Sequence, residues 1–395
     1  MKKQTMCVHT PYPRADAYGS LSMPVYHTAA YEFESAQQMA DAFCGRSDAP
    51  SYSRVTNPTV SYFENKVKAL TGAADVTAFN SGMAAISNVL MALACTGKNI
   101  VTSRHLFGNT YSLIAATLSR FGVKPKFCDT TDLQAVRRAV DDDTCCVFVE
   151  IITNPQLEVA DLSALSAAAH AHGACLVADT TAIPFTCFGA SALGVDIEVV
   201  SSTKYISGGA TSLGGLLIDY GTVAGLRGRV RAEMLYNLGA YMTPHAAYMQ
   251  TLGLETLHAR YQVQAANAAE LARRLCALDG VRKVNYPGLS GNRYYELAAR
   301  QFGNTAGAML TLELSSPQAC FCFIDSLKVV RRATNLFDNK SLAIHPASTI
   351  FGNFPPRRRA MMDVGENVVR LSCGLEDADD LFDDIAQAVR AAQDC

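Results

Sequence analysis

The sequence predicts an α/β fold, with a mainly parallel sheet in a large domain and a smaller α/β domain at the C-terminus. The chain has 395 residues, which is more than one hydrophobic core usually organises. From about Thr59 onward, short β-branched runs alternate with helical stretches, a pattern typical of βα units with parallel strands. Beyond about Pro244, a long stretch rich in Ala, Leu and Arg predicts a helix that leads into a second unit.

The start of the chain is predicted to form an arm and not a domain. It is rich in aromatic residues and turn formers, among them Pro11 and Pro13, and it shows no sustained helical period. We therefore divide the chain into an N-terminal arm at residues 1–55, a large domain at 56–245 and a C-terminal domain at 246–395.

Several runs in the large domain have the composition of short buried strands. The predicted strands cover residues 76–79, 100–103, 123–128, 145–151, 174–179 and 197–202. Two stretches between them have helix-forming composition, residues 132–140 and 162–172, and Gly173 after the second is typical of a C-terminal cap. The C-terminal domain is predicted to contain a long helix at 246–278 and strands at 308–314 and 368–372.

The composition is that of an ordinary globular protein, because 49% of the residues are hydrophobic and 18% are charged. A formal net charge of -2 offers no polycationic surface for nucleic acid. The longest apolar run, around residues 84–95, is too short to cross a bilayer, and no apolar stretch follows the basic residues at the start. We therefore expect a cytoplasmic protein that binds neither nucleic acid nor a membrane.

The cysteines are expected to be reduced. There are 13, an odd number, and they lack the paired C-x-x-C spacing of a zinc site or a disulfide framework. Cys145 and Cys146 lie in one apolar run, and Cys320 and Cys322 lie in another, so core packing explains both pairs. The histidines show no His-Glu-x-x-His or similar spacing, and no metal site is predicted.

Polar residues that follow predicted strands are the candidates for chemistry, because ligands of open α/β sheets bind beyond the carboxyl ends of parallel strands. Gly82 and Met83 open a helix directly after the first strand, where backbone N–H groups and the helix dipole favour a phosphate. An ordinary N-cap at Ser81 explains the same pattern. Asp179 places a carboxylate at a strand end, and a structural aspartate that caps a turn is equally compatible.

Two further strand ends carry Asn154 and Lys204. Asn154 precedes a proline that forces an extended exit from its strand. Lys204 has hydroxyl residues before it, including Ser201 and Thr203, and glycines after it, although a surface lysine is the ordinary alternative. Together these pieces indicate one chemical arrangement: a buried lysine forms an imine with an aldehyde cofactor, a carboxylate keeps a pyridine nitrogen protonated, and hydroxyls with helix amides hold a phosphate.

These motifs resemble the cystathionine/methionine metabolism (trans-sulfuration) family of pyridoxal 5'-phosphate (PLP) enzymes, which have fold type I of PLP-dependent transferases. The family contains cystathionine γ-synthase, cystathionine lyases, methionine γ-lyase and O-acetylhomoserine sulfhydrylase. The resemblance extends from Val8 through residues 371–376, nearly the whole chain. The segment 335–349 and the surroundings of Lys204 look closest to the sulfhydrylases, although these are often longer, with an insertion after the lysine motif that this chain lacks.

The resemblance implies a role for each candidate. Lys204 is the catalytic Schiff-base lysine, and Asn335 and Arg370 bind the substrate, with Arg370 clamping its α-carboxylate in a bidentate pair. Asp179 pairs with the pyridinium nitrogen, in a segment Asp-Thr-Thr where the family usually has Asp-Asn-Thr. The implied cofactor-binding residues are Tyr52, Arg54, Gly82, Met83, Phe107, Asn154, Asp179, Thr181, Ser201, Thr203 and Lys204.

The resemblance also implies an oligomer. Ser201 and Thr203 hold the phosphate of their own subunit, together with backbone amides at Gly82. Tyr52 and Arg54 reach the phosphate of the neighbouring subunit. The expected active unit is a dimer with shared active sites, and dimers are expected to pair into tetramers.

Two departures from the family bear on the reaction. Phe107 stands where the family has a stacking tyrosine, and phenylalanine can neither donate nor accept a proton. Asn109 stands where methionine γ-lyase has a cysteine. We therefore expect γ-replacement on an activated homoserine ester, O-acetylhomoserine, by sulfide or a small thiol. The run Arg357–Arg359 also departs from the usual pattern, and is either a solvated face or a border of the cleft entrance.

Three alternatives remain beside this expectation. One is γ- or β-elimination by a lyase acting on methionine or cystathionine. Another is a protein that binds PLP without turnover, which the presence of Lys204, Asp179 and Arg370 disfavours. A nucleotide-binding α/β protein is disfavoured because neither G-x-x-x-x-G-K nor a strand-linked G-x-G-x-x-G occurs.

Overall fold

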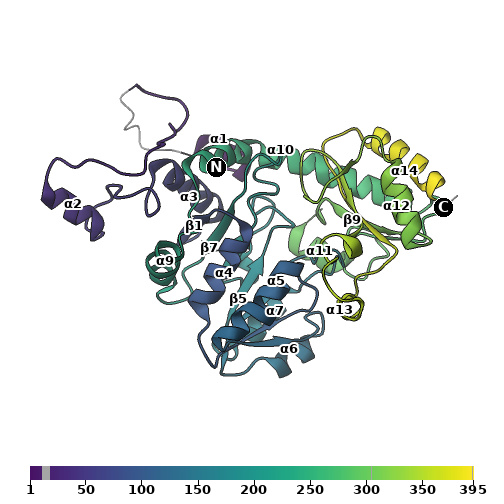
Figure 1. Ribbon diagram of the computed structural model, residues 1–395, viewed down its shortest axis with the longest axis horizontal. Helices are drawn as coiled ribbons and strands as arrows, with labels where there is room; N and C mark the ends of the chain where they lie inside the picture. The colour runs from purple at the N-terminus through teal and green to yellow at the C-terminus, as the bar shows by residue number, and fades with distance from the viewer. Residues whose placement is uncertain (11–17, 304, 394) are drawn as a thin grey trace.

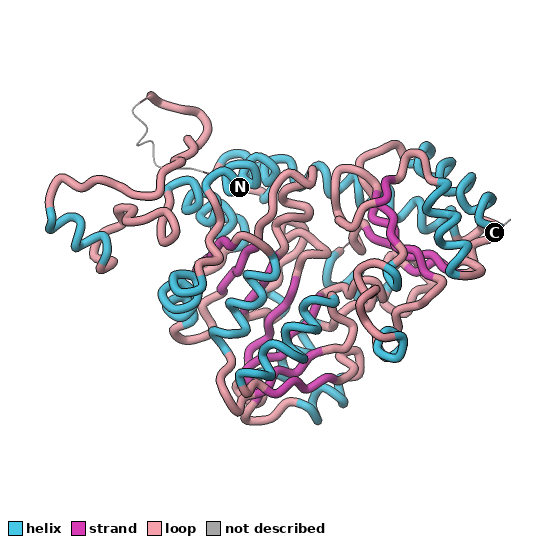
Figure 2. Tube along the Cα trace, in the orientation of Figure 1, coloured by secondary structure: helices cyan, strands magenta, loops and turns pink. Residues whose placement is uncertain are grey.

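The computed structural model describes residues 1–10, 18–303, 305–393 and 395, so Pro11 and Pro13 of the predicted arm lie outside the described residues. Two sheets dominate the described part (Figures 1 and 2). One has seven strands in the order β1-β7-β6-β5-β4-β2-β3, and the other has five in the order β10-β11-β12-β9-β8. Helix α10 (Pro244–Leu275) packs against α1 and α3 of the first unit and against α14 of the second, and so connects them.

The eight predicted strands correspond to β1–β6, β9 and β12 within about two residues at each end, and β7, β8, β10 and β11 were not predicted. The strands of the large sheet are β1 (Asp75–Phe79), β2 (Asn99–Thr102), β3 (Lys124–Phe127), β4 (Thr144–Glu150), β5 (Cys175–Asp179), β6 (Ile197–Val200) and β7 (Gly215–Asp219). Those of the small sheet are β8 (Lys283–Asn285), β9 (Met309–Glu313), β10 (Arg331–Arg332), β11 (Leu342–Ile344) and β12 (Val368–Ser372).

The helices lie between and around these strands. They are α1 (Lys3–His9), α2 (Ala36–Phe43), α3 (Pro58–Thr71), α4 (Gly82–Leu93), α5 (Gly108–Ser112), α6 (Leu133–Ala139), α7 (Leu162–His170), α8 (Leu226–Gly228), α9 (Tyr236–Leu238), α10, α11 (Tyr295–Phe302), α12 (Pro317–Ser326), α13 (Pro356–Met361) and α14 (Ala378–Gln393). Short π- or 3₁₀-helical turns are η1 (Leu113–Thr117), η2 (Leu118–Phe121), η3 (Ser191–Leu193), η4 (Arg229–Leu235) and η5 (Pro346–Ser348).

The large sheet is buried on both faces. Along β4, Val147 and Val149 belong to one hydrophobic cluster, whereas Cys146 and Phe148 belong to another. The first cluster contains side chains of α3, α7 and α10, and the second contains those of α4 and η4, so helices cover both faces. The predicted α/β class with a mainly parallel sheet is therefore confirmed.

Strand β7 was absent from the prediction. It pairs antiparallel with both β1 and β6, while β6, β5, β4, β2 and β3 are joined in parallel. Parallel strands are usually connected by a crossover helix, and this alternation guided the prediction. Among the described residues, no helix lies between β6 and β7. A short apolar run after a glycine-rich loop carries no periodicity that distinguishes it from a buried turn.

The predicted arm contains two short helices, α1 and α2, which the sequence analysis did not identify. These helices have 7 and 8 residues, too few for a sustained period to be visible in the sequence. Lys3 Nζ holds α1 against the body by donating to the carbonyls of Phe185 and Phe188 at 2.5 and 2.9 Å. Ser35 caps α2, which lies away from the body of the molecule (Figure 1).

The expectation that every cysteine is reduced is wrong for two of them. Cys322 and Cys395 form a disulfide across a sequence separation of 73 residues. Sequence spacing cannot reveal this pair, because it is the packing of α12 against α14 that brings the two segments together. Cys146 and Cys320 are buried free thiols, as core packing predicts.

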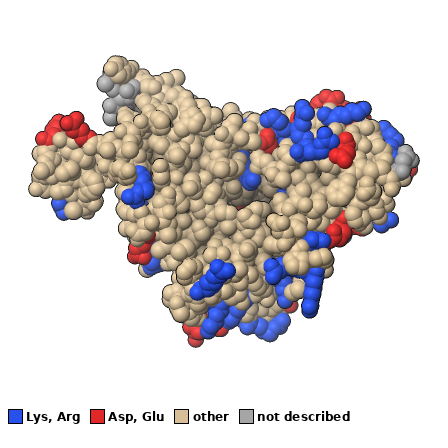
Figure 3. Space-filling model, viewed as in Figure 1, with Lys and Arg blue, Asp and Glu red and all other residues tan. Residues whose placement is uncertain are grey.

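The boundary placed at residue 245 stays a prediction, because it falls in the first turn of α10, a helix that packs against both units. Among the described residues, no helix is both long and apolar enough to cross a membrane. Lysines and arginines on the face in Figure 3 are interspersed with acidic residues and lie mostly toward its edges.

Candidate active site

The site forms where the large sheet meets the smaller unit. Lys204, which follows β6, donates from Nζ to Asn335 Oδ1 at 2.7 Å. Arg370 of β12 donates from Nη1 to Asn154 Oδ1 at 3.1 Å and from Nη2 to the Asn335 carbonyl at 3.0 Å. Four residues singled out from the sequence, far apart along the chain, thus form one hydrogen-bonded cluster.

The pKa of the Lys204 amine is lower than that of an ordinary lysine. Burial and the nearby positive charge of Arg370 lower the pKa of Lys204 to about 8, although the negative charges of Asp338 and Asp179 act in the opposite direction. A lysine with this pKa has a substantial neutral fraction near pH 8, and only the neutral amine attacks an aldehyde.

This pKa predicts how fast the cofactor-free protein takes up PLP at different pH values. The uptake rate is expected to rise about tenfold per pH unit below a midpoint of about 8 and to level off above it, because the neutral amine is the reacting species. Stopped-flow absorbance would measure the rate. A midpoint near the ordinary lysine value of 10.5 would contradict the burial of Lys204.

Asp338, which the sequence analysis missed, orients the amide that faces Lys204. The Asp338 side chain is buried, and its Oδ2 accepts from Asn335 Nδ2 at 3.1 Å. This bond turns Asn335 Oδ1 toward the Lys204 amine, because the two ends of a carboxamide have opposite hydrogen-bonding roles. Its position three residues after Asn335 was the available signal.

Two carboxylates end adjacent strands of the large sheet. Asp179 closes β5, where burial raises its pKa and the Thr181 amide donates to it at 3.0 Å. Glu150 closes β4 opposite Asp179, and burial together with the charge of Asp179 raises the pKa of Glu150 to about 8. Neighbouring like charges disfavour ionisation of both groups, which is why the charge of Asp179 contributes to the raised pKa of Glu150.

Glu150 was also missed by the sequence analysis, although its place at a strand end is the same signal that identified Asp179. Its Oε1 accepts from the Phe107 amide at 2.5 Å, and its Oε2 accepts from the Asn154 amide at 3.3 Å. Glu150 therefore fixes two loops of the site, the one that carries Phe107 before α5 and the one that carries Asn154.

The start of α4 approaches the Lys204 segment too closely for any side chain larger than that of glycine. A Cβ added at Gly82 would lie 2.7 Å from Ser201 Cβ and 2.9 Å from Ser201 Oγ. Ser81 is the N-cap of α4, as the alternative interpretation of this segment predicted, because its Oγ accepts from the Ala84 amide at 3.1 Å. The backbone amides of Gly82 and Met83 lie at the N-terminal end of α4, where Gly82 faces the Ser201 side chain.

The remaining cofactor candidates lie near the same edge but differ in their bonding. Thr181 Oγ1 accepts from the Ser201 amide at 2.8 Å, so it fixes the backbone at Ser201. Thr203 Oγ1 donates to the Gly214 carbonyl at 3.2 Å and accepts from the Gly214 amide at 2.9 Å. The Thr203 hydroxyl is thus already engaged within the chain.

Replacing Gly82 with alanine is expected to weaken cofactor binding by about 1–3 kcal/mol, because the new methyl group displaces Ser201. Equilibrium titration of the cofactor-free variant with PLP would measure the loss. Gly228→Ala is the matched control, since a Cβ there meets nothing within 4 Å. Equal affinity of the two variants would contradict the close approach of α4 to Ser201.

Tyr52 and Arg54 do not join the Lys204 cluster of their own chain. Tyr52 is 41% exposed, and Arg54 Nη1 donates to the Tyr236 carbonyl at 2.5 Å. Both line a cavity of about 280 Å³ that also contains Tyr241, whereas Lys204 lines a different cavity of about 320 Å³.

The arginine run lies on α13, at the edge of the site. Arg359 Nε donates to Glu366 Oε1 at 2.9 Å, and the Arg358 guanidinium lies 5.5 Å from the centroid of Phe354 and 5.9 Å from that of Tyr111 on α5. Since Phe107 is the N-cap of α5, the run borders an element of the site.

The residues fit PLP on two observations from the chain itself. A partly deprotonated buried lysine lies within electrostatic reach of the buried Asp179 carboxylate, as an aldehyde carbon and a pyridine nitrogen on one ring require. The start of α4 and Ser201 enclose a position that a glycine at residue 82 keeps open. Among the described residues, no group of three or more His, Cys, Asp or Glu could hold a metal ion.

Comparison with known proteins agrees with this arrangement. L-methionine gamma-lyase of Pseudomonas putida is 35% identical over 390 residues, covering 98% of this chain and 97% of the relative. O-succinylhomoserine sulfhydrylase of Pseudomonas aeruginosa is 37% identical over 377 residues, covering 93% of this chain and 90% of the relative. The relatives thus include both a lyase and a sulfhydrylase.

Solved structures match over the whole chain. A putative O-acetylhomoserine (thiol)-lyase of Campylobacter jejuni, which carries a pyridoxyl-lysine monophosphate, has a TM-score of 0.95 at 31% identity and covers 99% of this chain and 100% of its own. Cystathionine gamma-lyase of Lactobacillus plantarum, complexed with L-serine, has a TM-score of 0.92 at 30% identity and covers 100% of both chains. The fold is therefore fold type I of PLP-dependent enzymes, as predicted.

The family model of the Cys/Met metabolism PLP-dependent enzymes matches residues 4–390. This chain therefore belongs to the Cys/Met metabolism family of PLP-dependent enzymes.

Proposed function

We propose that this PLP-dependent enzyme catalyses γ-replacement on an activated homoserine ester, O-acetylhomoserine, with sulfide or a small thiol as the incoming group. The observation that carries the proposal is Phe107, anchored by its amide to Glu150 at the site, where the family has an ionisable tyrosine. A side chain that cannot donate a proton suits a reaction whose leaving group, acetate, departs as a stable anion and needs no protonation. Sulfhydrylases are among the relatives.

Arg370 is proposed to bind the substrate α-carboxylate. Burial lowers the pKa of Arg370 to about 10, and its Nε has no hydrogen-bond partner among the described residues. Among the described residues, no acidic side chain pairs with Arg370. A buried guanidinium without a carboxylate partner strongly favours binding the carboxylate of a substrate. Asn154 and Asn335 hold the other side of the guanidinium and so fix its direction.

Lys204 is proposed to move the protons. PLP, when bound, supplies a ring that withdraws electrons and so stabilises negative charge at the substrate Cα. The free Lys204 amine would take the proton from the substrate Cα and transfer protons at Cβ, for which a pKa of about 8 is well matched. Asp179 supports this chemistry as the proposed partner of the ring nitrogen.

The test compares two kinds of substrate on the purified holoenzyme. O-Acetylhomoserine with sulfide is expected to give homocysteine and acetate faster than methionine or cystathionine alone gives keto acid and ammonia. Faster release of keto acid and ammonia would overturn replacement in favour of elimination, and no turnover of either kind would favour a protein that binds PLP without catalysis.

Replacing Phe107 with tyrosine is expected to raise elimination from methionine relative to replacement by about tenfold or more, because it adds a proton donor beside a poor leaving group. Keto acid release and homocysteine formation would be measured on one preparation. Phe107→Leu is the control that removes the ring without adding a hydroxyl. An unchanged ratio in Phe107→Tyr would show that this position does not set the reaction.

We also propose that the active unit is a dimer with shared sites, which pairs into a tetramer in the cytoplasm. Its support is the separation of Tyr52 and Arg54 from Lys204 within one chain, combined with the exposure of Tyr52. Mixing an inactive Arg54→Ala variant with an inactive Lys204→Ala variant tests this. Recovery of activity on mixing supports shared sites, and no recovery after subunit exchange contradicts them.

A further inference from the structure

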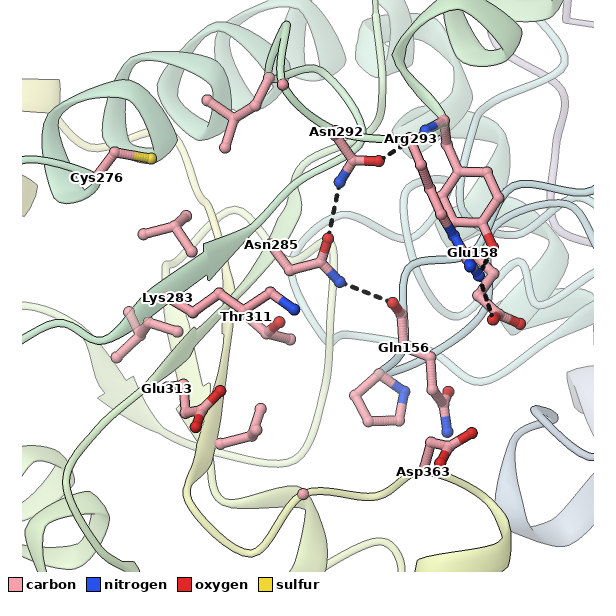
Figure 4. A pocket seen from close by; sticks show the side chains of 18 of the residues that line it. Gln156, Glu158, Cys276, Lys283, Asn285, Asn292, Arg293, Thr311, Glu313 and Asp363 are labelled. Carbon is pink, nitrogen blue, oxygen red and sulfur yellow. Dashed lines mark hydrogen bonds and ion pairs between the residues drawn. The ribbon is translucent and has the colours of Figure 1, made fainter.

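A second cavity, larger than the one at Lys204, lies between the two units (Figure 4). Its volume is about 840 Å³, against about 320 Å³ at Lys204. Residues 105, 155, 156 and 158 of the large unit form one wall, and residues of β8, β9 and segment 289–294 form the other. Cavities of this size between structural units are frequent binding sites for small molecules. Nothing in the proposed reaction uses this one.

The floor of the second cavity is a polar patch of the small sheet. Strands β8 and β9 are antiparallel, with Lys283 opposite Glu313 and Asn285 opposite Thr311. Because residues two apart on a strand share a face, these four side chains point to the same side, and Figure 4 shows them around the cavity. Arg370 pairs with Thr311 on the next strand, so the patch continues the row that holds the proposed substrate clamp.

Two opposite charges on this floor have no protein partner. Among the described residues, neither the Lys283 ammonium nor the Glu313 carboxylate makes a hydrogen bond or an ion pair. The other charged groups of the cavity are paired already: Arg293 Nη2 donates to Glu158 Oε1 at 3.0 Å, and His105 lies 2.7 Å from Glu158 Oε2 and 2.9 Å from Asp363 Oδ2. One positive and one negative group are left, a combination that matches a zwitterion.

The rest of the lining suits a molecule with an apolar portion. Pro155, Leu289 and Val368 line the cavity beside the charges, and Val368 is opposite Glu313 in the sheet. Gln156 adds a buried Oε1 atom that lacks a hydrogen-bond partner among the described residues. A buried acceptor without a partner is unfavourable, and a donor on a bound molecule would satisfy it.

Residues 154–156 contact both the second cavity and the active site. On one side, Asn154 Oδ1 accepts from Arg370 at 3.1 Å. On the other side, the Gln156 carbonyl accepts from Asn285 Nδ2 at 2.8 Å, as the dashed line in Figure 4 shows. A molecule that contacts Asn285 and Gln156 therefore lies next to the segment that orients the Arg370 guanidinium.

We propose that the second cavity binds an α-amino acid with an apolar side chain, separately from the active site. Its carboxylate pairs with Lys283, its ammonium pairs with Glu313, and its side chain lies over Leu289 and Val368. This site does not depend on the proposed reaction, because none of these groups takes part in it.

The chain contains no tryptophan, so one introduced at Ser290, an exposed residue of the cavity lining, reports on this cavity alone. The holoenzyme of Ser290→Trp is titrated with L-leucine, which has no leaving group at Cβ or Cγ and is not consumed by replacement or elimination. A saturable change in tryptophan fluorescence is expected. 4-Methylpentanoate lacks the ammonium and 3-methylbutylamine lacks the carboxylate, so each is expected to bind about tenfold more weakly or worse.

Added substitutions in the reporter protein assign the charges. Lys283→Met and Glu313→Gln are each expected to weaken leucine binding about tenfold, whereas Lys124→Met, on the distant β3, leaves it unchanged. Arg370→Met separates the two sites, because it removes the active-site clamp and is expected to preserve the signal. Absence of a saturable signal up to the solubility limit of leucine overturns the proposal. So does a signal that Arg370→Met abolishes while Lys283→Met and Glu313→Gln retain it.

Discussion

Replacing Lys204 with alanine is expected to lower kcat by about 10³-fold or more, because the same amine is proposed to hold the cofactor and to move the protons at Cα and Cβ. The variant is also expected to lose the covalent link to PLP, which borohydride reduction followed by peptide mass analysis would detect. Both effects follow from a lysine whose pKa burial and Arg370 lower to about 8, beside an amide that accepts from it.

Lys204→Arg separates charge from chemistry, since arginine keeps the positive charge but offers no amine that can condense with an aldehyde. It is expected to be as inactive as the alanine variant. Adding a small primary amine to Lys204→Ala is expected to restore part of the rate, because the cavity left by the side chain can admit a replacement base. Lys124→Ala, at an exposed position of β3, is the matched control. Wild-type kcat in Lys204→Ala would refute the proposed role.

The sequence predicted the parts of this molecule that depend on local pattern. The parallel strands were visible because buried strands consist of short β-branched runs, and the strand ends then pointed to Asp179, Asn154 and Lys204. Strand β7 and the Cys322–Cys395 disulfide were missed because each is decided by long-range packing. No window of the sequence contains that information.

The site shows the same division between local and long-range information. Lys204 and Arg370 were singled out by motif. The sequence did not show that the Asn335 side chain accepts from Lys204 while the Asn335 backbone carbonyl accepts from Arg370. Glu150 was missed because a glutamate at the end of an apolar strand is also typical of an ordinary polar strand end. Its pairing with Asp179 across the sheet, which raises its pKa, exists only in the fold.

These contacts connect the two units chemically. Asn335 and Arg370 belong to the smaller unit, whereas Lys204 and Asn154 belong to the larger, and hydrogen bonds join them in both directions. A change in the position of one unit relative to the other therefore alters the surroundings of Arg370 and of Lys204 together, the proposed substrate clamp and catalytic amine. The second cavity lies between the same two units, which is why a molecule bound there would act on the geometry of Arg370.

Replacing Arg370 with methionine is expected to lower kcat/KM by about 10²-fold or more, since two charge-assisted hydrogen bonds to the substrate carboxylate are lost. Its effect on stability is expected to be small, within about 2 kcal/mol of the wild-type free energy of unfolding. The buried guanidinium of Arg370 has only neutral acceptors among the described residues, and its pKa is lowered to about 10 by burial. Removing an uncompensated buried charge relieves a desolvation cost, which offsets the acceptors left behind at Asn154 and Asn335.

Arg231 is the control, because it is a largely buried arginine that, unlike Arg370, is paired with carboxylates. It donates to Asp75 Oδ2 and to Glu64 Oε2, each at 3.0 Å, and the charges of these carboxylates raise its pKa although burial opposes the shift. Within the described part of the chain, Arg231→Met leaves Glu64 without an ion-pair partner and leaves Asp75 with Arg227 alone, at 3.5 Å, so it is expected to lower the free energy of unfolding by about 3–5 kcal/mol while leaving KM nearly unchanged. Chemical denaturation and steady-state kinetics on both variants would separate the cases. If Arg370→Met is destabilised as much as Arg231→Met, then Arg370 holds the fold together and is not held in reserve for a substrate carboxylate.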